Sequence, residues 1–245
     1  MNRDWDPEQP EWMDRPQPVN PGLERDLANL GALNRYFGGH ALVRRFLERW
    51  LRASPSGQKP LRILDLCTGY GDIPRMIADW AVPRGIAVEI DAVDFHPATL
   101  DIAQRKSAAY PQIRFLHGDA LAYSPPEPPA RYDLVHCSLA LHHFSEADAV
   151  RLLERCLHLS RRYVLVTDLE RNRLSQFAVW LVTATLYRDP MTRHDARLSV
   201  RRAFSAGELD ALAKKAGWHG FHRERFLPCR QALWMAHVSP LHPSP

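Results

Sequence analysis

L-R-I-L-D-L-C-T-G-Y-G-D, residues 61–72, joins an apolar run to a turn with two glycines and then to a helical pattern. The apolar alternation up to Leu66 is typical of a buried parallel strand. Gly69 and Gly71 allow a tight turn and a close approach of the backbone to a ligand. Asp72 stands where the N-cap of the following helix belongs. The stretch therefore predicts a strand–turn–helix unit of the kind that binds nucleotide-like cofactors.

The loop also narrows the class of cofactor. A dinucleotide fingerprint needs a third glycine where Pro74 stands, and no G-K-[ST] run of a phosphate-binding loop occurs. What remains is the acid-led turn Asp65-x-x-x-Gly69-x-Gly71. An acid beside the ligand suits a cationic or amine-bearing cofactor and disfavours a pyrophosphate. An NAD-linked oxidoreductase is therefore a distant alternative.

At this point the chain resembles the class I S-adenosylmethionine (SAM) dependent methyltransferases, whose first motif runs D/E-x-G-x-G-x-G. Cys67 replaces the first glycine of that motif. The run S-L-A-L-H-H-F, residues 138–144, resembles the S/N-x-x-L-H-H segment of the menaquinone and ubiquinone methyltransferase branch. T-R-H-D (192–195) and S-V-R-R-A-F (199–204) are similar to runs in polyketide-associated bacterial O-methyltransferases. The resemblance implies SAM as cofactor and S-adenosylhomocysteine as product.

Bulk composition limits the other possibilities. The chain has 245 residues, 45% of them hydrophobic and 24% charged, with a net charge of +4 and a pI of about 9.0. This suits one soluble α/β domain with additional helices. The arginine pairs are scattered, so no nucleic-acid partner is expected. Four separated cysteines and a polar, Pro-rich start favour a reduced cytoplasmic protein, and no apolar run reaches membrane-spanning length. A homodimer is left open.

We expect two parts: residues 1–58 as an N-terminal tail and helical cap, and 59–245 as the catalytic domain, with a lid insertion at about 173–204. The predicted fold is a Rossmann-like, seven-stranded, mostly parallel sheet with helices on both faces and an antiparallel C-terminal hairpin. The expected strands are 61–66, 87–94, 113–117, 132–138, 163–168, 220–227 and 231–238. The expected helices begin at Gly22 and after Gly39, and cover 72–81, 97–109, 146–159, 175–187 and 208–216. Residues 189–205 are expected to form a polar, Arg-rich loop.

Acids at the strand ends supply the predicted cofactor site, because the carboxyl ends of parallel strands meet at one edge. Asp65 ends the first strand. Asp94 ends the second and is placed to accept hydrogen bonds from ribose hydroxyls. The resemblance implies that Asp119 and the Ala120 N–H face adenine and that the loop at Ser138 lies near the methionine part. The full predicted set is Asp65, Thr68, Gly69, Gly71, Asp94, Phe95, Asp119, Ala120 and Ser138.

Histidines are the candidate catalytic groups. His142 and His143 open the segment after the fourth strand, beside the expected methyl donor, and either could act as general base because imidazole titrates near neutral pH. His194, followed by Asp195, is a third candidate. The alternative for His142 and His143 is that one packs on the sheet and the other bonds a loop. The alternative for His194 is a surface loop in which Asp195 caps the backbone. No metal site is expected, since adjacent histidines point in different directions.

The expected acceptor is a small, aromatic, partly acidic molecule. Its predicted contacts are Trp180, on the apolar helix, with Arg193, His194 and Arg201 beyond it. The residues just before Gly38, namely Asn34, Arg35 and Tyr36, are further candidates for the cofactor's carboxylate or the substrate. We predict methyl transfer to a phenolic or polyketide-like oxygen, as in natural-product biosynthesis. Carbon methylation of a quinone precursor and a non-catalytic SAM-binding protein are the alternatives.

Overall fold

The computed structural model describes residues 2–51, 59–125 and 131–237. The strands in this part are β1 (Leu61–Leu66), β2 (Val88–Asp94), β3 (Ile113–His117), β4 (Tyr132–Ser138), β5 (Ser160–Leu169), β6 (His222–Phe226) and β7 (Arg230–Ala236). The α-helices are α1 (Pro21–Tyr36), α2 (Gly39–Trp50), α3 (Asp72–Ala81), α4 (Pro97–Lys106), α5 (Glu146–Leu159), α6 (Arg173–Leu186), α7 (Pro190–Arg202) and α8 (Ala206–Lys215). Short 3₁₀ turns cover Trp12–Asp14 (η1), Val82–Arg84 (η2) and Leu141–His143 (η3).

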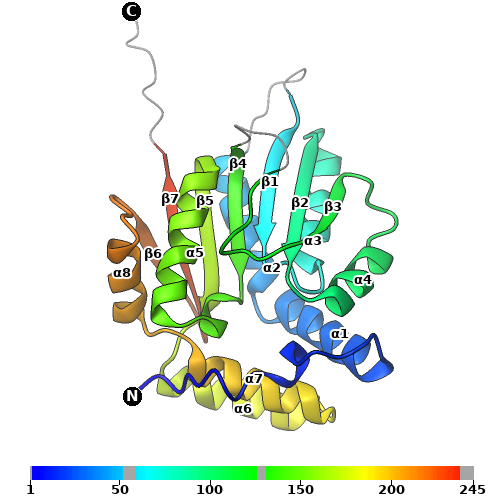
Figure 1. Cartoon of the computed structure of the whole chain (residues 1–245), viewed down its shortest axis with the longest axis vertical. Coiled ribbons are helices and arrows are strands. Elements are labelled where there is room, and N and C mark those ends of the chain that lie inside the picture. The colour runs from blue at the N-terminus through cyan, green and yellow to red at the C-terminus, as the bar shows by residue number, and fades with distance from the viewer. Residues whose placement is uncertain (1, 52–58, 126–130, 238–245) are drawn as a thin grey trace, which may run out of the picture.

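The described strands form one seven-stranded sheet in the order β3-β2-β1-β4-β5-β7-β6 (Figure 1). The pairs from β3 to β5 are parallel, whereas β7 runs antiparallel to both β5 and β6. The order reverses between β1 and β4, so this pair marks the switch point at which open α/β sheets bind their ligands. The predicted sheet and terminal hairpin are confirmed.

Both faces of the sheet are buried, which explains the near-continuous apolar runs of its central strands. One face packs against α5 and α8, where Leu153, Cys156 and Trp218 are buried with sheet residues such as Val135. The other face packs against α2 and α3, where Phe46 and Ile77 meet a second set of strand residues. The alternating side chains of each strand therefore supply two separate cores and hold the strand ends in fixed positions.

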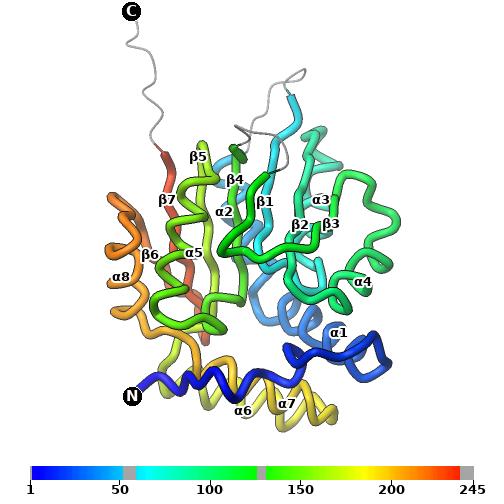
Figure 2. Tube along the Cα trace, viewed as in Figure 1, coloured from blue at the N-terminus to red at the C-terminus, as the bar shows by residue number. Residues whose placement is uncertain are grey.

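Helices α1, α6 and α7 gather beyond the carboxyl ends of β1 and β4, together with residues 2–20, which we call the strap (Figures 1 and 2). Helices α6 and α7 pack on each other, and α7 also contacts α1 and the 3₁₀ turn of the strap. The strap runs along α7 in both views. Elements from both ends of the chain thus enclose the edge where the sequence predicts the site.

The prediction of a polar loop at 189–205 is wrong, because residues 190–202 form helix α7. Asp189 is its N-cap and accepts hydrogen bonds from the N–H groups of Met191 and Thr192, with Pro190 at the first helical position. The buried face of the helix carries polar residues such as Thr192, Asp195 and Ser199. An apolar period of 3.6 is therefore absent from the sequence, and the helix was missed.

Other boundaries differ by a few residues, and one cap differs in kind. Gly71, not Asp72, is the N-cap of α3 and has a left-handed φ of 71°. Asp72 instead turns its carboxylate to Asn34 and His40 on the N-terminal helices. The division at residues 58/59 stays a prediction. The sequence also predicts a turn-rich linker over 54–60 and a Pro-rich loop over 124–129, and both lie largely outside the described residues.

Candidate active site

The turn after β1 is held by its own acid. The Asp65 carboxylate accepts hydrogen bonds from Thr68 Oγ1 and His136 Nδ1, both at 2.6 Å, and the side chain is buried. Asp65 therefore fixes the turn from beneath. Cys67, where the methyltransferase motif has glycine, has a φ of 57°. A non-glycine residue in this left-handed region costs free energy and persists only where the surroundings impose it, which is typical of functional turns.

Asp94 ties the end of β2 to the same turn. Its Oδ2 accepts from the Gly69 N–H at 2.7 Å and its Oδ1 from the His96 N–H at 3.0 Å. Burial raises the pKa of Asp94, and the two N–H donors oppose that rise. Each oxygen keeps a second lone pair, so the carboxylate can still accept from a ligand hydroxyl. The side chain is thus both a fastener of the turn and a wall of the site.

A cavity of about 480 Å³, the outer cavity, lies between the strap and the ends of β2 and β3. The predicted cofactor residues Gly69, Asp94, Phe95, Asp119 and Ala120 line it. Asp119 accepts from the Leu121 N–H and is exposed, and the Phe95 ring is 61% exposed. An exposed ring and carboxylate beside a cavity are free to contact a planar, amine-bearing group.

A second cavity of about 180 Å³, the inner cavity, adjoins the first, because Met13, Cys67, Gly69, Leu139 and His143 line both. The inner cavity contains the predicted cofactor residues Asp65, Thr68 and Ser138. Its remaining walls are largely apolar and come from α1, α6 and the start of β7; they include Leu27, Leu30, Leu33, Phe37, Val179, Val182 and Pro228. Gly71 lines neither cavity; its missing side chain makes room for the Phe115 ring.

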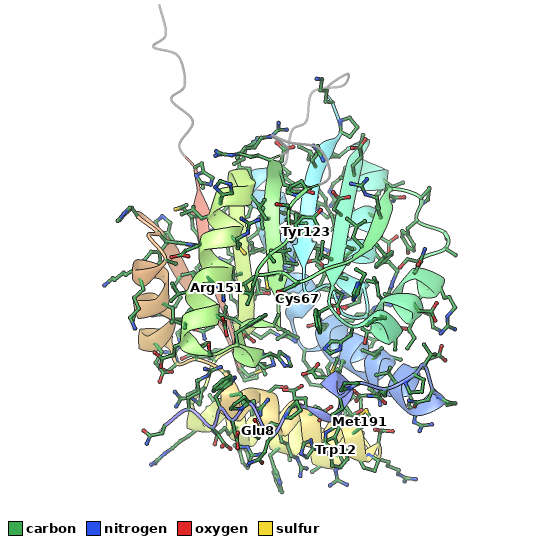
Figure 3. The ribbon with its side chains drawn as sticks, viewed as in Figure 1. Glu8, Trp12, Cys67, Tyr123, Arg151 and Met191 are labelled. Carbon is green, nitrogen blue, oxygen red and sulfur yellow. The ribbon has the colours of Figure 1, made fainter. Side chains whose placement is uncertain are left out.

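The strap covers both cavities and is attached along its length. Trp5 Nε1 donates to the His143 carbonyl, and the Trp12 ring stacks on His194 at 4.2 Å between centroids. Glu11 is buried and accepts from Ser199 Oγ on α7 at 2.7 Å. Figure 3 shows Cys67, just after β1, at the lower edge of the sheet, and Trp12 in the layer below that edge. Trp5 and Trp12 thus dock the N-terminal tail on the body of the protein.

His142 is buried between two carboxylates. Its Nδ1 bonds to Asp168 Oδ1 at 2.7 Å, and its Nε2 lies 3.6 Å from Glu11 Oε1. Burial lowers the pKa of His142, but the opposing effect of the Asp168 and Glu11 carboxylates is larger. The net result is a pKa raised to about 10. The imidazole is therefore protonated at neutral pH, and this arrangement opposes the general-base role that the sequence suggested for it.

His143 lines both cavities and bonds through Nδ1 to Asp14 Oδ2 at 2.8 Å. Burial lowers its pKa, and the Asp14 carboxylate outweighs burial and raises it. Contrary to the expected divergence of adjacent histidines, the rings of His142 and His143 are 4.2 Å apart, and each offers a ligand atom within 4.8 Å of Glu11. Both imidazoles already have a carboxylate partner, so the cluster is accounted for as an ion-pair network.

The structure does not bring the predicted substrate residues to either cavity: Trp180, Arg193, His194 and Arg201 are absent from both linings. Trp180 is half exposed on α6, and Arg201 faces Asp4 of the strap. His194 bonds through Nδ1 to its neighbour Asp195 and stacks on Trp12. These side chains lie on the outer parts of α6 and α7, because the faces of these helices that line the inner cavity carry smaller residues.

Several lining residues were missed by sequence reasoning. Glu11 lies in a Pro-rich tail where nothing distinguishes it from other acids, and Arg230 is one of many scattered arginines. Leu139, with a φ of 51°, follows Ser138 at the end of β4 and separates the two cavities. Only Asn34, among the residues suggested before Gly38, lines the inner cavity; its neighbours Arg35 and Tyr36 are exposed.

Comparisons with known proteins agree with this geometry. Residues 63–162 match the family described as a methyltransferase domain. The chain is 31% identical over 161 residues to the 2-phytyl-1,4-naphthoquinone methyltransferase of Thermosynechococcus vestitus, covering 64% of this chain and 67% of that protein. It is 37% identical over 101 residues to the demethylmenaquinone methyltransferase of Deinococcus radiodurans, covering 40% of this chain and only 39% of that relative's length.

Among solved structures, the plantazolicin methyltransferase in complex with S-adenosylhomocysteine superimposes with a TM-score of 0.63 at 14% identity, covering 89% of this chain and 91% of that one. At this identity the likeness concerns the fold. The strand-end acids, the two adjoining cavities and the relatives define a class of enzyme. The chain belongs to the SAM-dependent methyltransferases. Within them, its sequence relatives bear the names of menaquinone and naphthoquinone methyltransferases.

Proposed function

We propose that this protein transfers a methyl group from SAM to a phenolic oxygen of a small aromatic acceptor. The proposal rests on one observation: a single cavity has both a wall of predicted cofactor residues and an apolar wall suited to an aromatic acceptor. The strand-end residues Asp65, Thr68 and Ser138 line its inner wall, and the apolar side chains of α1 and α6 line the rest. A mostly apolar cavity with a few convergent polar groups is typical of a site for a small apolar ligand.

The residues present fit the cofactor. The outer cavity is the larger of the two and would hold the adenosyl part, with Asp94 toward the ribose hydroxyls and Asp119 and Ala120 toward adenine. Ser138 and the turn at Thr68 would hold the methionine part. When bound, SAM supplies an electrophilic methyl group on its sulfonium. The protein would orient the two reactants and exclude water from the site. Both effects lower the barrier of a displacement reaction.

His142 would act on the acceptor as a cation. Because Asp168 and Glu11 hold its pKa at about 10, the imidazole carries its proton at neutral pH. It lines the inner cavity, where its positive charge would stabilise an ionised acceptor. This role favours acceptors acidic enough to ionise in the site. His143, which bonds Asp14, is then the candidate that would take the acceptor's proton. His194 would contribute indirectly, by holding the strap through its stack on Trp12.

Methylation at carbon is a second candidate, favoured by the names of the sequence relatives. The same cavity would hold a quinol, whose ring carbon becomes nucleophilic once a hydroxyl ionises. The His142 imidazolium would assist either outcome. We also infer a reducing cytoplasmic location from the four free thiols. No helix in the described ranges is long and apolar enough to cross a bilayer.

The function is tested with methyl-labelled SAM, the purified chain and two probes, 1-naphthol and 2-methyl-1,4-naphthoquinol. We expect an O-methyl ether from both, identified by mass and NMR. A ring-methylated quinol product would establish the alternative, and absence of transfer to either probe while S-adenosylhomocysteine binds would favour a non-catalytic role.

The role of the His142 cation is tested with Asp168→Asn. This variant should lower kcat/KM about 10- to 100-fold at pH 7.5. Wild-type activity should fall near pH 10, where His142 loses its proton, and the activity of the variant should fall at a lower pH. Arg151→Gln, on the exposed face of α5, is the control.

A further inference from the structure

Arg230, the first residue of β7, is a buried cation without a carboxylate partner in the described part of the chain. Its side chain is 6% exposed and lines the inner cavity. Nε donates to the Phe37 carbonyl at 3.0 Å, which leaves the two terminal nitrogens. No carboxylate oxygen of the residues that the structure describes lies within 4.0 Å of the guanidinium. Burial lowers the pKa of Arg230, and Cys229 and the more distant carboxylates of Asp72 and Asp168 oppose that fall without pairing with the guanidinium, so the group stays charged.

An uncompensated charge in a protein interior is costly, because the solvation lost on burial is not replaced. The other buried arginines show the usual solution. Arg202 donates to two carbonyls of the strap, and Arg171 donates to the Ala203 carbonyl and to the Glu208 carboxylate. Arg230 has a single such bond and faces a cavity. The position is therefore suited to an anion that arrives with a ligand.

Asn34 supplies a complementary group beside it. Its Nδ2 donates to Asp72 Oδ2 at 3.2 Å, whereas its Oδ1 is buried and has no donor. Exchanging the amide atoms would set the oxygen against the Asp72 carboxylate, so Asp72 fixes this orientation. An unpaired buried acceptor costs about as much as a lost hydrogen bond. Asn34 Oδ1 is therefore able to accept a hydrogen bond from an N–H donor of a ligand.

The two unpaired groups face the same point. A methyl group added to Gly39 would collide with Asn34 Oδ1 and would lie 3.1 Å from Arg230 Nη1. The close approach of α1 to Gly39 of α2 therefore places the Asn34 amide oxygen next to the Arg230 guanidinium. Both residues line the inner cavity. A ligand that satisfies both must carry a carboxylate and an ammonium close together. That is the chemistry of an α-amino acid.

We propose that Arg230 and Asn34 bind the α-carboxylate and the α-ammonium of the methionine part of SAM. Gly39, which has no side chain, leaves room for Asn34 Oδ1 beside Arg230, and Asp72 orients Asn34. The N-terminal helical cap is then part of the cofactor site, because it supplies Asn34 and Gly39 while the core supplies Arg230. The proposal rests on the assignment of the cavity to a SAM-dependent methyltransferase.

The test is calorimetric titration of the full chain with S-adenosylhomocysteine and with 5′-methylthioadenosine, which shares the adenosyl thioether but lacks the amino-acid part. Arg230→Gln should weaken S-adenosylhomocysteine binding at least tenfold and leave 5′-methylthioadenosine binding within twofold of wild type. Asn34→Ala should act in the same direction by a smaller factor. Arg44→Gln removes an exposed charge from the neighbouring helix α2 and should change neither affinity.

Retained 5′-methylthioadenosine binding also shows that the variant is folded. Unchanged S-adenosylhomocysteine affinity in Arg230→Gln would overturn the proposal, since the guanidinium would then serve the acceptor or the fold. An equal loss for both ligands would overturn it as well, because Arg230 would then support the adenosyl half. Failure of the wild-type chain to bind S-adenosylhomocysteine would contradict the proposed function itself, which separates the two failures.

Discussion

At the scale of single residues, the acids of this site each have two tasks. Asp94 receives the N–H groups of Gly69 and His96 and also lines the outer cavity. Asp65 fixes the turn through Thr68 and also lines the inner cavity. The turn is therefore shaped by side chains that also line the two cavities. A change at either acid should affect binding through both loop geometry and direct contact.

Asp94→Ala is expected to weaken S-adenosylhomocysteine binding about tenfold or more. The change removes a buried charged acceptor, worth roughly 1.5–3 kcal/mol, and frees the Gly69 N–H. Calorimetric titration measures the loss. Glu89→Ala, which removes an exposed acid of the same strand, is the matched control and should bind like wild type. Equal affinities in both variants would refute the place given to β2.

At the scale of elements, α7 depends on its cap and its contacts more than on an apolar stripe. Its buried Thr192 donates to Asp26 on α1, its Asp195 receives the N–H groups of Trp12 and Met13, and Ser199 bonds Glu11. Polar bonds thus attach α1 and the strap to one helix. Because such bonds contribute only when correctly oriented, the start of α7 must be well defined.

Asp189→Ala should therefore lower the free energy of unfolding by about 1 kcal/mol, the usual cost of losing an N-cap side chain. The variant loses the bonds to the Met191 and Thr192 N–H groups and the ion pair with Arg25. Urea denaturation gives the difference. Arg25→Ala removes only the exposed ion pair and should cost less than about 0.5 kcal/mol. Equal effects would attribute the loss to the ion pair instead of the cap.

At the scale of the whole molecule, the enclosure of the site has an electrostatic cost. Asp26 of α1 is fully buried against α7; its Oδ1 accepts from Thr192 Oγ1, and its Oδ2 has no partner. Burial raises its pKa to about 7, an effect that the Thr192 hydrogen bond reduces and the Asp195 charge increases. The folded protein therefore binds this proton more tightly than the unfolded chain.

The stability of the protein should accordingly fall as the pH rises from about 4 to about 7, and this contribution should level off above pH 7. Within that window the folded state holds more protons at Asp26 than the unfolded state, so the slope is negative. A shift of about 3 units corresponds to roughly 4 kcal/mol. Asp26→Asn should remove the slope and be more stable at pH 8, in urea titrations across this range. The exposed Asp101→Asn should keep the slope; a wild-type slope in Asp26→Asn would contradict the assignment.

Much of the fold, and several residues of the two cavity walls, could be predicted from the sequence because its signals are local. The Leu61–Leu66 alternation, the two glycines and the acid at each strand end are set by period and turn chemistry. The spacing of Asp65, Asp94 and Asp119 predicted that they meet at one edge, and they line the two adjoining cavities. Parallel strands bring their carboxyl ends together whatever covers them.

Only the tertiary structure decided how that edge is closed. Helix α7 has no apolar period, and its stability comes from partners distant in sequence, such as Glu11, which lies 188 residues from Ser199. Trp180 and Arg193 have the composition of a binding site but lie outside the cavities, whereas Arg230 and Asn34 are inconspicuous in sequence and face each other across Gly39. The protonation of His142 likewise depends on Asp168 and Glu11. Burial and charge at these positions are properties of the assembled chain, and no local pattern encodes them.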